Sequence, residues 1–364
     1  MAQKKKTKSE EKTVEQKENQ LSMTDIIVQK AKEKYGNQTI LTPKDVELMN
    51  QRVTKKNVIP SGSISFDGLT GIGGLPAGRI FLAFGPSGIG KTTTCLALYK
   101  EASKLGYILV YIDMEHRLDV SLLDSMGIDR YDPNKFVLIL PNYGIEAFDM
   151  VYSLLQMGKP LFIILDSISS IKVRPSDKAK SYGEGKRMGQ VAAMMSEFLK
   201  DVTPLISDSN SVLMQISQER IQGLGSGMPF KSSTGGKAPE FYSTLVWQVF
   251  KSQGGDIVKN NRIIGHELSW KFKKISTGLP QSNKKIAIKF GYGFYKEYEL
   301  LRIAEQIGLV KKSGSWYTYN ETKGQGFMSL VEVFENDKKL YNDCLLYTSP
   351  SPRDLSTSRM PSSA

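Results

Sequence analysis

The sequence predicts an α/β fold, in which a mainly parallel central sheet is extended by antiparallel strands. Three observations support this prediction. Residues 85–92 match the phosphate-binding pattern Gly-x-x-x-x-Gly-Lys-Thr and lie between an apolar run and a helical pattern. Further apolar runs alternate with helical segments, as expected when helices cover both faces of a parallel sheet. After Phe241, apolar and polar residues alternate with period two, which is typical of antiparallel strands.

Composition narrows the class of protein. The chain has 364 residues, of which 40% are hydrophobic and 24% charged, so it can form one large globular domain and a smaller one. Its two cysteines, Cys95 and Cys344, exclude a disulfide scaffold and indicate a reducing, cytoplasmic compartment. No apolar run approaches the ~20 residues that cross a bilayer, so we expect no membrane partner. The net charge of +12 favours a polyanionic partner such as nucleic acid.

The first 56 residues divide into two segments. Residues 1–20 are almost all polar or charged, and we expect a disordered basic arm because too little apolar surface is present to offset the entropy of ordering. In residues 21–56 we expect a helix, followed by a short strand at Thr39–Leu41. Neither can bury its apolar side on itself. We therefore expect this segment to link the chain to a neighbouring subunit, with folding back onto its own core as the alternative.

The main domain is predicted from residue 57 to residue 297. It starts with a strand at Arg79–Phe84, continues through the phosphate-binding loop, and enters a helix at Thr92–Leu105 that Gly106 caps. Apolar residues at helical spacing form the inner face of this helix: Cys95, Leu98, Ala102 and Leu105.

The phosphate-binding loop, or P-loop, predicts a nucleotide site. Its glycines allow positive φ, so that backbone N–H groups face a polyphosphate at the helix N-terminus. Lys91 supplies a positive charge for the phosphates, and Thr92 supplies a hydroxyl group for Mg²⁺. The predicted nucleotide-binding residues of this loop are Gly85, Pro86, Ser87, Gly88, Ile89, Gly90, Lys91, Thr92 and Thr93.

Four more strands are predicted at residues 107–113, 136–140, 160–166 and 211–216. Chemistry in such sheets gathers at the carboxyl ends of the strands. There, Asp166 is a candidate to orient Mg²⁺. Glu115 is the best candidate to polarise an attacking water molecule, and Asp113 is its rival. We interpret His116 as structural. Gln215 is our first choice, from the residues alone, for a neutral side chain that senses the terminal phosphate.

Five segments, in this order and at these spacings, resemble RecA-type homologous-recombination ATPases: GLPAGRIFLAFGPSGIGKTT, YIDMEHRLD, FIILDS, STGGKAPEFY and GSWYTY. The resemblance runs from about Lys32 to Tyr319. It implies a RecA-like P-loop core with an N-terminal oligomerisation arm and a small α+β C-terminal domain. It also implies an enzyme that uses ATP and Mg²⁺, forms homo-oligomeric helical filaments on single-stranded DNA and exchanges strands with a homologous duplex.

The resemblance assigns roles to single residues. It implies that Glu115 is the catalytic glutamate, that Asp166 is the acid of the metal site, and that Gln218 rather than Gln215 couples ATP to DNA. Asp119 resembles the aspartate that contacts adenine.

Two further positions concern the nucleotide. We place Phe290 at the nucleotide, and Leu122 stands where the family often has an aromatic residue.

The assignment of two lysines stays open. At the positions that correspond to residues 271–274, the family has two lysines that reach the terminal phosphate bound by the neighbouring subunit, in the manner of an arginine finger. Because the register shifts by one residue, we choose Lys274 together with Lys271 or Lys273. A solvated strand edge is the alternative.

Two glycine-rich loops, at residues 174–188 and 219–236, are predicted to hold DNA. Cations there release counterions, and hydroxyl and glycine N–H groups bond the phosphate backbone. The candidates are Lys186, Arg187, Met188, Arg220, Ser232, Ser233, Thr234, Gly235 and Gly236. Gly223 and Gly227 stand where the family tends to have bulky apolar residues; Leu224, Met228 or Phe230 could replace them as the wedge between bases.

The C-terminal part is predicted as a small, truncated domain at residues 298–343 and a tail at residues 344–364 that resembles translated adapter sequence, not native protein. Two other functions compete with a recombinase. One is a DNA motor of the same superfamily, such as a ring helicase or branch-migration ATPase. The other is a nucleotide-gated DNA-binding mediator without catalysis, which the presence of Lys91, Thr92, Glu115 and Asp166 disfavours.

Overall fold

The structure is a computed structural model, and it describes residue 33 and residues 57–174, 187–222, 230–233, 236–276 and 283–348. For residues 187–188, 220–222 and 230–233 it describes the backbone alone. The chain divides into two units, Met1–Asn57 and Val58–Ala364. The predicted N-terminal arm and subunit-linking segment fall in the first unit, outside the described residues apart from Glu33. All that follows concerns the second unit.

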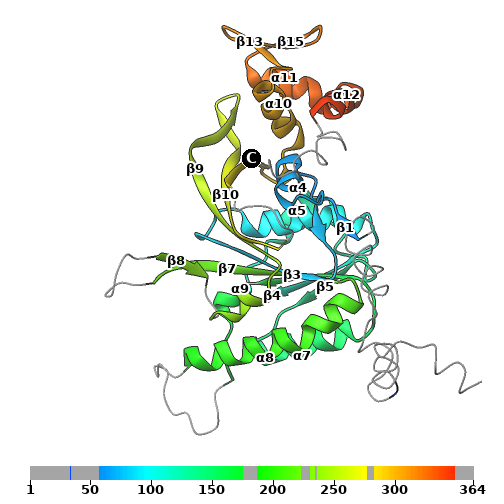
Figure 1. Cartoon of the computed structure of the whole chain (residues 1–364), viewed down its shortest axis with the longest axis vertical. Helices are drawn as coiled ribbons and strands as arrows, with labels where there is room; N and C mark the ends of the chain where they lie inside the picture. Colours follow the sequence, from blue (N-terminus) through cyan, green and yellow to red (C-terminus); the bar gives the residue numbers. More distant parts are fainter. Residues whose placement is uncertain are drawn as a thin grey trace, which may run out of the picture. The chain divides into compact units, whose positions relative to one another are not determined.

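A ten-stranded sheet organises the described part of the second unit (Figure 1). Its strand order is β12-β11-β10-β9-β3-β7-β6-β4-β5, and β8 pairs with β7 off this path. The six strands from β9 to β5 run parallel, whereas β10, β11 and β12 are antiparallel additions. The predicted α/β fold with an antiparallel extension is confirmed. The strands are β3 (Arg79–Gly85), β4 (Ile108–Asp113), β5 (Phe136–Ile139), β6 (Leu161–Asp166), β7 (Val212–Gln222), β8 (Phe230–Ser233), β9 (Leu245–Lys259), β10 (Arg262–Ile275), β11 (Asn283–Lys289) and β12 (Gly293–Phe294).

Helices cover both faces of the parallel strands. In Figure 1, α4 (Ile64–Thr70) and α5 (Lys91–Ser103) lie on one side of the sheet, and α7 (Gly144–Leu155) and α8 (Arg187–Asp208) lie on the other. The side chains of β3 alternate between the two resulting cores. Phe81 and Ala83 pack with α5, whereas Ile80, Leu82 and Phe84 pack with α7 and α8. This two-sided burial explains why the parallel strands are almost continuously apolar.

Short elements complete the core. β1 (Val58–Ile59) and β2 (Leu75–Pro76) pair antiparallel before the P-loop strand. Helix α6 (Val120–Ser125) follows β4, a 3₁₀ turn (Ile168–Ser170) follows β6, and α9 (Ala238–Tyr242) precedes β9.

The structure corrects two details of the sequence prediction. The P-loop helix ends at Ser103, so Leu105 lies beyond it and is 55% exposed instead of belonging to its inner face. Strand β7 continues to Gln222, and its last residues pair antiparallel with β8. Part of the second predicted DNA loop, residues 219–236, is therefore a β-hairpin. Its polar sequence lacks the apolar alternation that would have predicted a strand.

A smaller domain follows the sheet. It contains α10 (Lys296–Gln306), a three-stranded sheet of β13 (Lys311–Ser313), β14 (Trp316–Tyr319) and β15 (Thr322–Gln325), and then α11 (Phe327–Asn336) and α12 (Lys338–Thr348). Its core is separate from the other two. Helix α12 crosses the predicted boundary at residue 343, and Cys344 is fully buried in this core. The sequence prediction places residues 344–348 in the tail, together with the serine- and proline-rich residues that follow them. Residues 349–364 lie outside the described residues.

Candidate active site

The P-loop begins where β3 ends, between two parallel neighbours. In β3, Gly85 is paired with Gln218 of β7, and a Cβ atom at Gly85 would lie 2.3 Å from the carbonyl oxygen of Val249. Gly88 and Gly90 have φ of 71° and 92°, in the left-handed region that favours glycine. The prediction that positive φ explains the P-loop glycines is thus wrong for Gly85. Glycine is needed at this position because the backbone of β9 approaches too closely for a side chain.

The side chain of Lys91 folds back onto the backbone of the P-loop. It is only 7% exposed, and its Nζ donates to the carbonyl oxygens of Gly85, at 3.0 Å, and Pro86, at 2.6 Å. Burial lowers the pKa of Lys91, while the nearby charges of Asp166 and Glu115 act in the opposite direction. The ammonium group therefore lies within the P-loop at the N-terminus of α5, and helix N-termini are typical anion-binding positions.

Asp166 lies at the end of β6, next to the first turn of α5. Its Oδ2 accepts hydrogen bonds from Thr92 Oγ1 at 2.6 Å and from the Tyr111 hydroxyl at 2.7 Å. Burial raises the pKa of Asp166, and the two hydrogen bonds counteract this rise. Hydroxyl and carboxylate oxygens are the ligands that Mg²⁺ prefers, and it commonly takes one or two from the protein and others from substrate phosphates. Thr92 and Asp166 therefore fit a Mg²⁺ site.

Glu115 follows the end of β4 with a partly exposed carboxylate. Its Oε1 accepts hydrogen bonds from Ser167 Oγ at 2.7 Å, Ser170 Oγ at 3.2 Å and Gln218 Nε2 at 3.2 Å. Three donors thus hold one oxygen: two serines from the segment after β6 and one glutamine from β7. The arrangement positions the carboxylate at the cavity described below, where it can accept a proton from water.

Its rival Asp113 has a different environment. Asp113 is 3% exposed, and its two carboxylate oxygens accept hydrogen bonds from the backbone N–H groups of Glu115, Arg117 and Leu118, at 3.0, 2.8 and 2.8 Å. This side chain shapes the loop that carries Glu115. His116, whose φ is 55°, contacts the carbonyl oxygen of Pro141 through Nε2 at 3.2 Å, which agrees with a structural role.

These side chains surround a cavity of about 310 Å³. It brings together many of the predicted residues: Ser87, Gly88, Gly90, Lys91, Thr92, Thr93, Glu115, Asp119, Asp166 and Gln218. Asp119 is at the rim, where it caps α6 by accepting a hydrogen bond from Ser121 N at 2.9 Å. Leu122, from the same helix, also lines the cavity.

Some predicted residues lie elsewhere. Phe290 is outside the lining of this cavity; it follows β11, is 53% exposed and packs edge-on against His266. Gln215 is fully buried, with Nε2 3.4 Å from Ser243 Oγ, so it does not face Glu115 as Gln218 does. The choice of Gln218 over Gln215 therefore agrees with the geometry.

The three lysines of β10 do not line the cavity of their own chain. Lys271 is exposed, Lys273 lies over the ring of Phe84 with Nζ 4.5 Å from its centroid, and Lys274 donates to the carbonyl oxygens of Glu240 and Phe241 at 3.2 and 2.7 Å. After a register shift between Phe272 and Lys274, Lys274 is paired with Val246 near the start of β9, whereas Lys271 is paired with Gln248, level with the end of β3.

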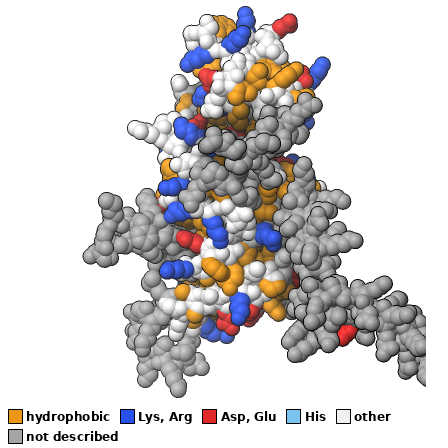
Figure 2. Space-filling view, viewed as in Figure 1, with side chains coloured by type: hydrophobic (Ala, Val, Ile, Leu, Met, Phe, Trp, Pro, Cys, Tyr) orange, Lys and Arg blue, Asp and Glu red, His pale blue; other side chains and the backbone are white. Residues whose placement is uncertain are grey.

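The predicted DNA-binding residues are described in part. Lys186, Thr234 and Gly235 lie outside the described residues, while Arg187 and Met188 begin α8. Arg220 and Ser232 are paired across the β7–β8 hairpin, and Ser233 is opposite Glu219. Gly236 is exposed with φ of 84°. In Figure 2, basic side chains of the described residues are spread over the visible face among acidic and apolar ones.

Sequence reasoning missed Tyr111, Ser167 and Ser170. A signal was present for Tyr111, because it lies two residues before Asp113 in β4 and so shares its face of the strand. Ser167 and Ser170 follow Asp166 within four residues, but hydroxyl residues after a strand are too common to single them out.

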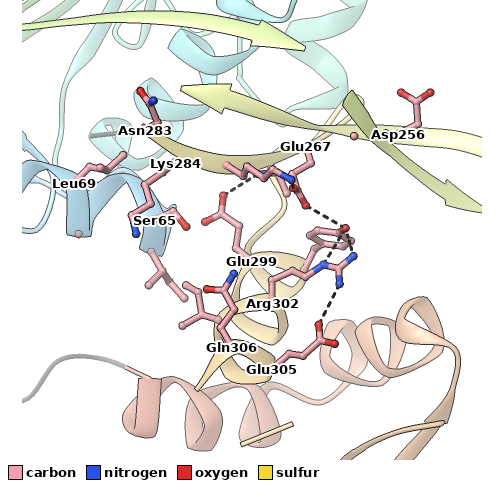
Figure 3. A pocket seen from close by; sticks show the side chains of 18 residues that line it. Ser65, Leu69, Asp256, Glu267, Asn283, Lys284, Glu299, Arg302, Glu305 and Gln306 are labelled. Carbon is pink, nitrogen blue, oxygen red and sulfur yellow. Dashed lines mark hydrogen bonds and ion pairs between the residues drawn. The ribbon is translucent and has the colours of Figure 1, made fainter. Parts of the chain in front are cut away.

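A second cavity, of about 950 Å³, lies between α4, the β9–β10–β11 strands and α10 (Figure 3). Several of its charged side chains have partners within the lining: Arg302 donates to Glu305 and Tyr298, and Lys285 pairs with Glu267. It contains none of the predicted site residues, and we do not assign it a ligand.

The fold and the first cavity together define a P-loop nucleotide-binding protein of the α/β class. Comparison with known proteins narrows this class. The RecA N-terminal domain matches residues 22–295 and the RecA C-terminal domain matches residues 298–344. The chain therefore belongs to the RecA family.

Relatives named Protein RecA cover most of the chain. That of Mycoplasma mycoides is 35% identical over 287 residues, which cover 78% of this chain and 81% of the relative. That of Chloroherpeton thalassium is 31% identical over 341 residues, 93% of this chain and 92% of the relative. That of Borrelia duttonii is 34% identical over 307 residues, 82% of each. None of the described helices has the length and apolar character that crossing a membrane needs.

Proposed function

We propose that this protein is an ATP-dependent DNA recombinase that forms filaments on single-stranded DNA and exchanges strands with a homologous duplex. The observation that carries the proposal is the position of Gln218. Its Nε2 lies 3.2 Å from Glu115 Oε1, and its strand β7 continues without a break into the β7–β8 hairpin, which carries Arg220 and Ser232. One rigid strand thus joins the candidate ATP site to the candidate DNA site.

The proposed chemistry is hydrolysis of ATP. Lys91 and the P-loop N–H groups bind the phosphates, and Glu115 takes a proton from the attacking water molecule while Ser167, Ser170 and Gln218 hold its carboxylate. Mg²⁺, held by Thr92 and Asp166, would offset the negative charge of the phosphates.

Coupling to DNA follows from the same contacts. The terminal phosphate competes with Glu115 for the amide of Gln218, so its loss moves the end of β7 and the hairpin beyond it. Arg220 and the serines of β8 then change their approach to the DNA backbone, and ATP turnover releases DNA.

The filament completes the active site. Lys271, Lys273 and Lys274 do not line the cavity of their own chain, which favours their use at the ATP site of a neighbouring subunit. Cations supplied in this way stabilise charge in the transition state. Residues 21–56 are proposed to link successive subunits, and the cytoplasm is the proposed location.

One experiment tests the proposal. ATP hydrolysis is measured with and without single-stranded DNA, while the assemblies are imaged by electron microscopy. We expect DNA to stimulate hydrolysis and helical filaments to form with ATP. A DNA-independent rate without filaments would contradict a recombinase, and rings on DNA would indicate a motor instead.

A further inference from the structure

The hydroxyl group of Tyr111 makes a contact that the function proposed above does not use. It donates to Asp166 Oδ2 at 2.7 Å, and Thr92 Oγ1 donates to the same oxygen at 2.6 Å. Asp166 is therefore held from two sides, by a residue of β4 and by a residue of α5. Tyr111 also lines the candidate nucleotide cavity.

The backbone and ring of Tyr111 cannot easily move. The residue is 1% exposed, and β4 is paired on both sides, with Tyr111 opposite Leu138 of β5 and Ile164 of β6. Its ring belongs to the core between the sheet and α5. A hydroxyl group on such a fixed support restricts the rotation of the carboxylate that it contacts.

We propose that Tyr111 is a positioning residue of the metal site, which aims the Asp166 carboxylate so that it and Thr92 receive Mg²⁺ together. The inference rests on the proposed nucleotide function. The hydrogen bond from Thr92 restrains Oδ2 from one side only, that of α5. The phenol supplies the second point of attachment, as outer hydrogen-bond partners do for ligands in other metal sites.

The test uses Tyr111→Phe, which keeps the ring and the packing of the core. Its matched control is Tyr99→Phe. Tyr99 belongs to the same core and is 3% exposed, and its hydroxyl donates to the carbonyl oxygen of Lys135 at 3.1 Å, away from Asp166. Both variants lose one hydroxyl hydrogen bond, but only one of these bonds is to the metal site.

Binding of a fluorescent ATP analogue is measured at equilibrium, first in a chelator and then across a Mg²⁺ titration. For Tyr111→Phe we expect the half-saturating Mg²⁺ concentration to rise about tenfold, as is typical when an outer partner of a metal ligand is lost. We expect its affinity for the analogue in chelator, and both quantities in Tyr99→Phe, to match the wild type.

An equal Mg²⁺ midpoint in the two variants would overturn the inference, as would a loss of affinity in chelator as large as the loss with Mg²⁺. In an Asp166→Asn background, Tyr111→Phe should add no further change; an undiminished effect there would also overturn it. If nucleotide binding by the wild-type protein did not depend on Mg²⁺, the proposed function itself would be contradicted. This result is distinguishable from a failure of the Tyr111 inference, which concerns only the difference between the variants and the wild type.

Discussion

Glu115 and Asp113 show how two carboxylates, two residues apart, acquire different environments. Asp113 accepts three backbone hydrogen bonds and is buried, so its oxygens are occupied in holding the loop. Glu115 follows two residues later, after β4 has ended; both residues line the cavity, but the carboxylate of Glu115 is held by side chains instead of by the backbone. The hydrogen bonds from Ser167, Ser170 and Gln218 leave it oriented but still accessible to water.

Replacing Glu115 with Gln should lower the rate of ATP hydrolysis by about 10²- to 10⁴-fold, because a general base is lost while the shape of the side chain is kept. Nucleotide affinity and filament formation should stay close to those of the wild type. Single-turnover hydrolysis and equilibrium binding measure the two effects separately.

The control for this prediction is Glu321→Gln, the same chemical change at an exposed turn between β14 and β15. It should leave hydrolysis unchanged. Normal turnover in Glu115→Gln would show that another group accepts the proton.

At the level of elements, the P-loop depends on how closely β3 approaches β9. The two strands are paired from Phe81 to Phe84, and Gly85 continues β3 against the backbone of Val249. A side chain at this position would meet the carbonyl oxygen of another strand, which cannot rotate away. The glycine therefore belongs to the packing of the sheet as well as to the nucleotide site.

Gly85→Ala should lower the free energy of unfolding by about 2 kcal/mol or more, because the added Cβ forces two paired strands apart. Nucleotide affinity should fall with it, since the same shift displaces the loop. Urea unfolding and analogue binding measure these effects.

Gly68→Ala is the matched comparison. Gly68 lies inside α4, and a Cβ atom there would meet nothing within 4 Å. Alanine favours a helix over glycine by about 1 kcal/mol, so this variant should be as stable as the wild type or more so. Equal losses in the two variants would contradict the packing explanation of Gly85.

At the level of the whole molecule, a buried carboxylate joins the small domain to the core. Glu299 of α10 is 3% exposed and accepts hydrogen bonds from Ser63 Oγ at 2.7 Å and Ala287 N at 3.1 Å. Figure 3 shows it pointing away from the ion pair of Arg302 and Glu305. Burial raises the pKa of Glu299 from 4.5 to about 8, and burial also raises the pKa of Asp67, on α4, to about 6.

This contact predicts a pH dependence. Because the pKa of Glu299 is higher in the folded state, the protonated form is favoured there, and its contribution to stability is lost as pH rises from 4.5 through 8. As the pH rises from 6 to 8, the free energy of unfolding of Glu299→Gln should therefore increase by about 2 kcal/mol relative to the wild type, since Gln carries no charge to bury. Urea unfolding at several pH values measures the difference.

Glu297→Gln, a partly buried position on the same helix, controls for the removal of a carboxylate. It should leave the pH dependence as it is in the wild type. A constant difference between Glu299→Gln and the wild type from pH 6 to pH 8 would contradict the role of Glu299.

The assembly makes a further prediction about the lysines of β10. Lys274→Ala and Glu115→Gln should each be inactive alone, but in an equal mixture about a quarter of head-to-tail interfaces combine an intact Glu115 with an intact Lys274. ATP hydrolysis should recover to that extent. Repeating the mixture with Lys271→Ala or Lys273→Ala identifies the second lysine. No recovery with any of the three would place these lysines outside the neighbour's site.

Much of the fold was predictable from local patterns. The strands of the parallel core were recognised because both of their faces are buried, which makes them continuously apolar. The β7–β8 hairpin was not, since Glu219 and Arg220 are polar on both faces of the strand. The end of α12 was not either, because the sequence prediction ends the small domain at residue 343, although Leu340, Cys344 and Leu345 recur at helical spacing. These elements depend on partners far away in the chain.

By itself the sequence determined the α/β fold, the P-loop and the carboxylates at the strand ends, because each follows from residue types at short, fixed spacings. Only the tertiary structure showed which groups hold the carboxylates of Asp113 and Glu115, explained Gly85 by its contact with Val249, and placed the Tyr111 hydroxyl on Asp166. The physical reason is that these distinctions rest on hydrogen bonds and contacts between separate strands. Pairing and packing determine them, and neither can be read from the spacing of residues along one segment.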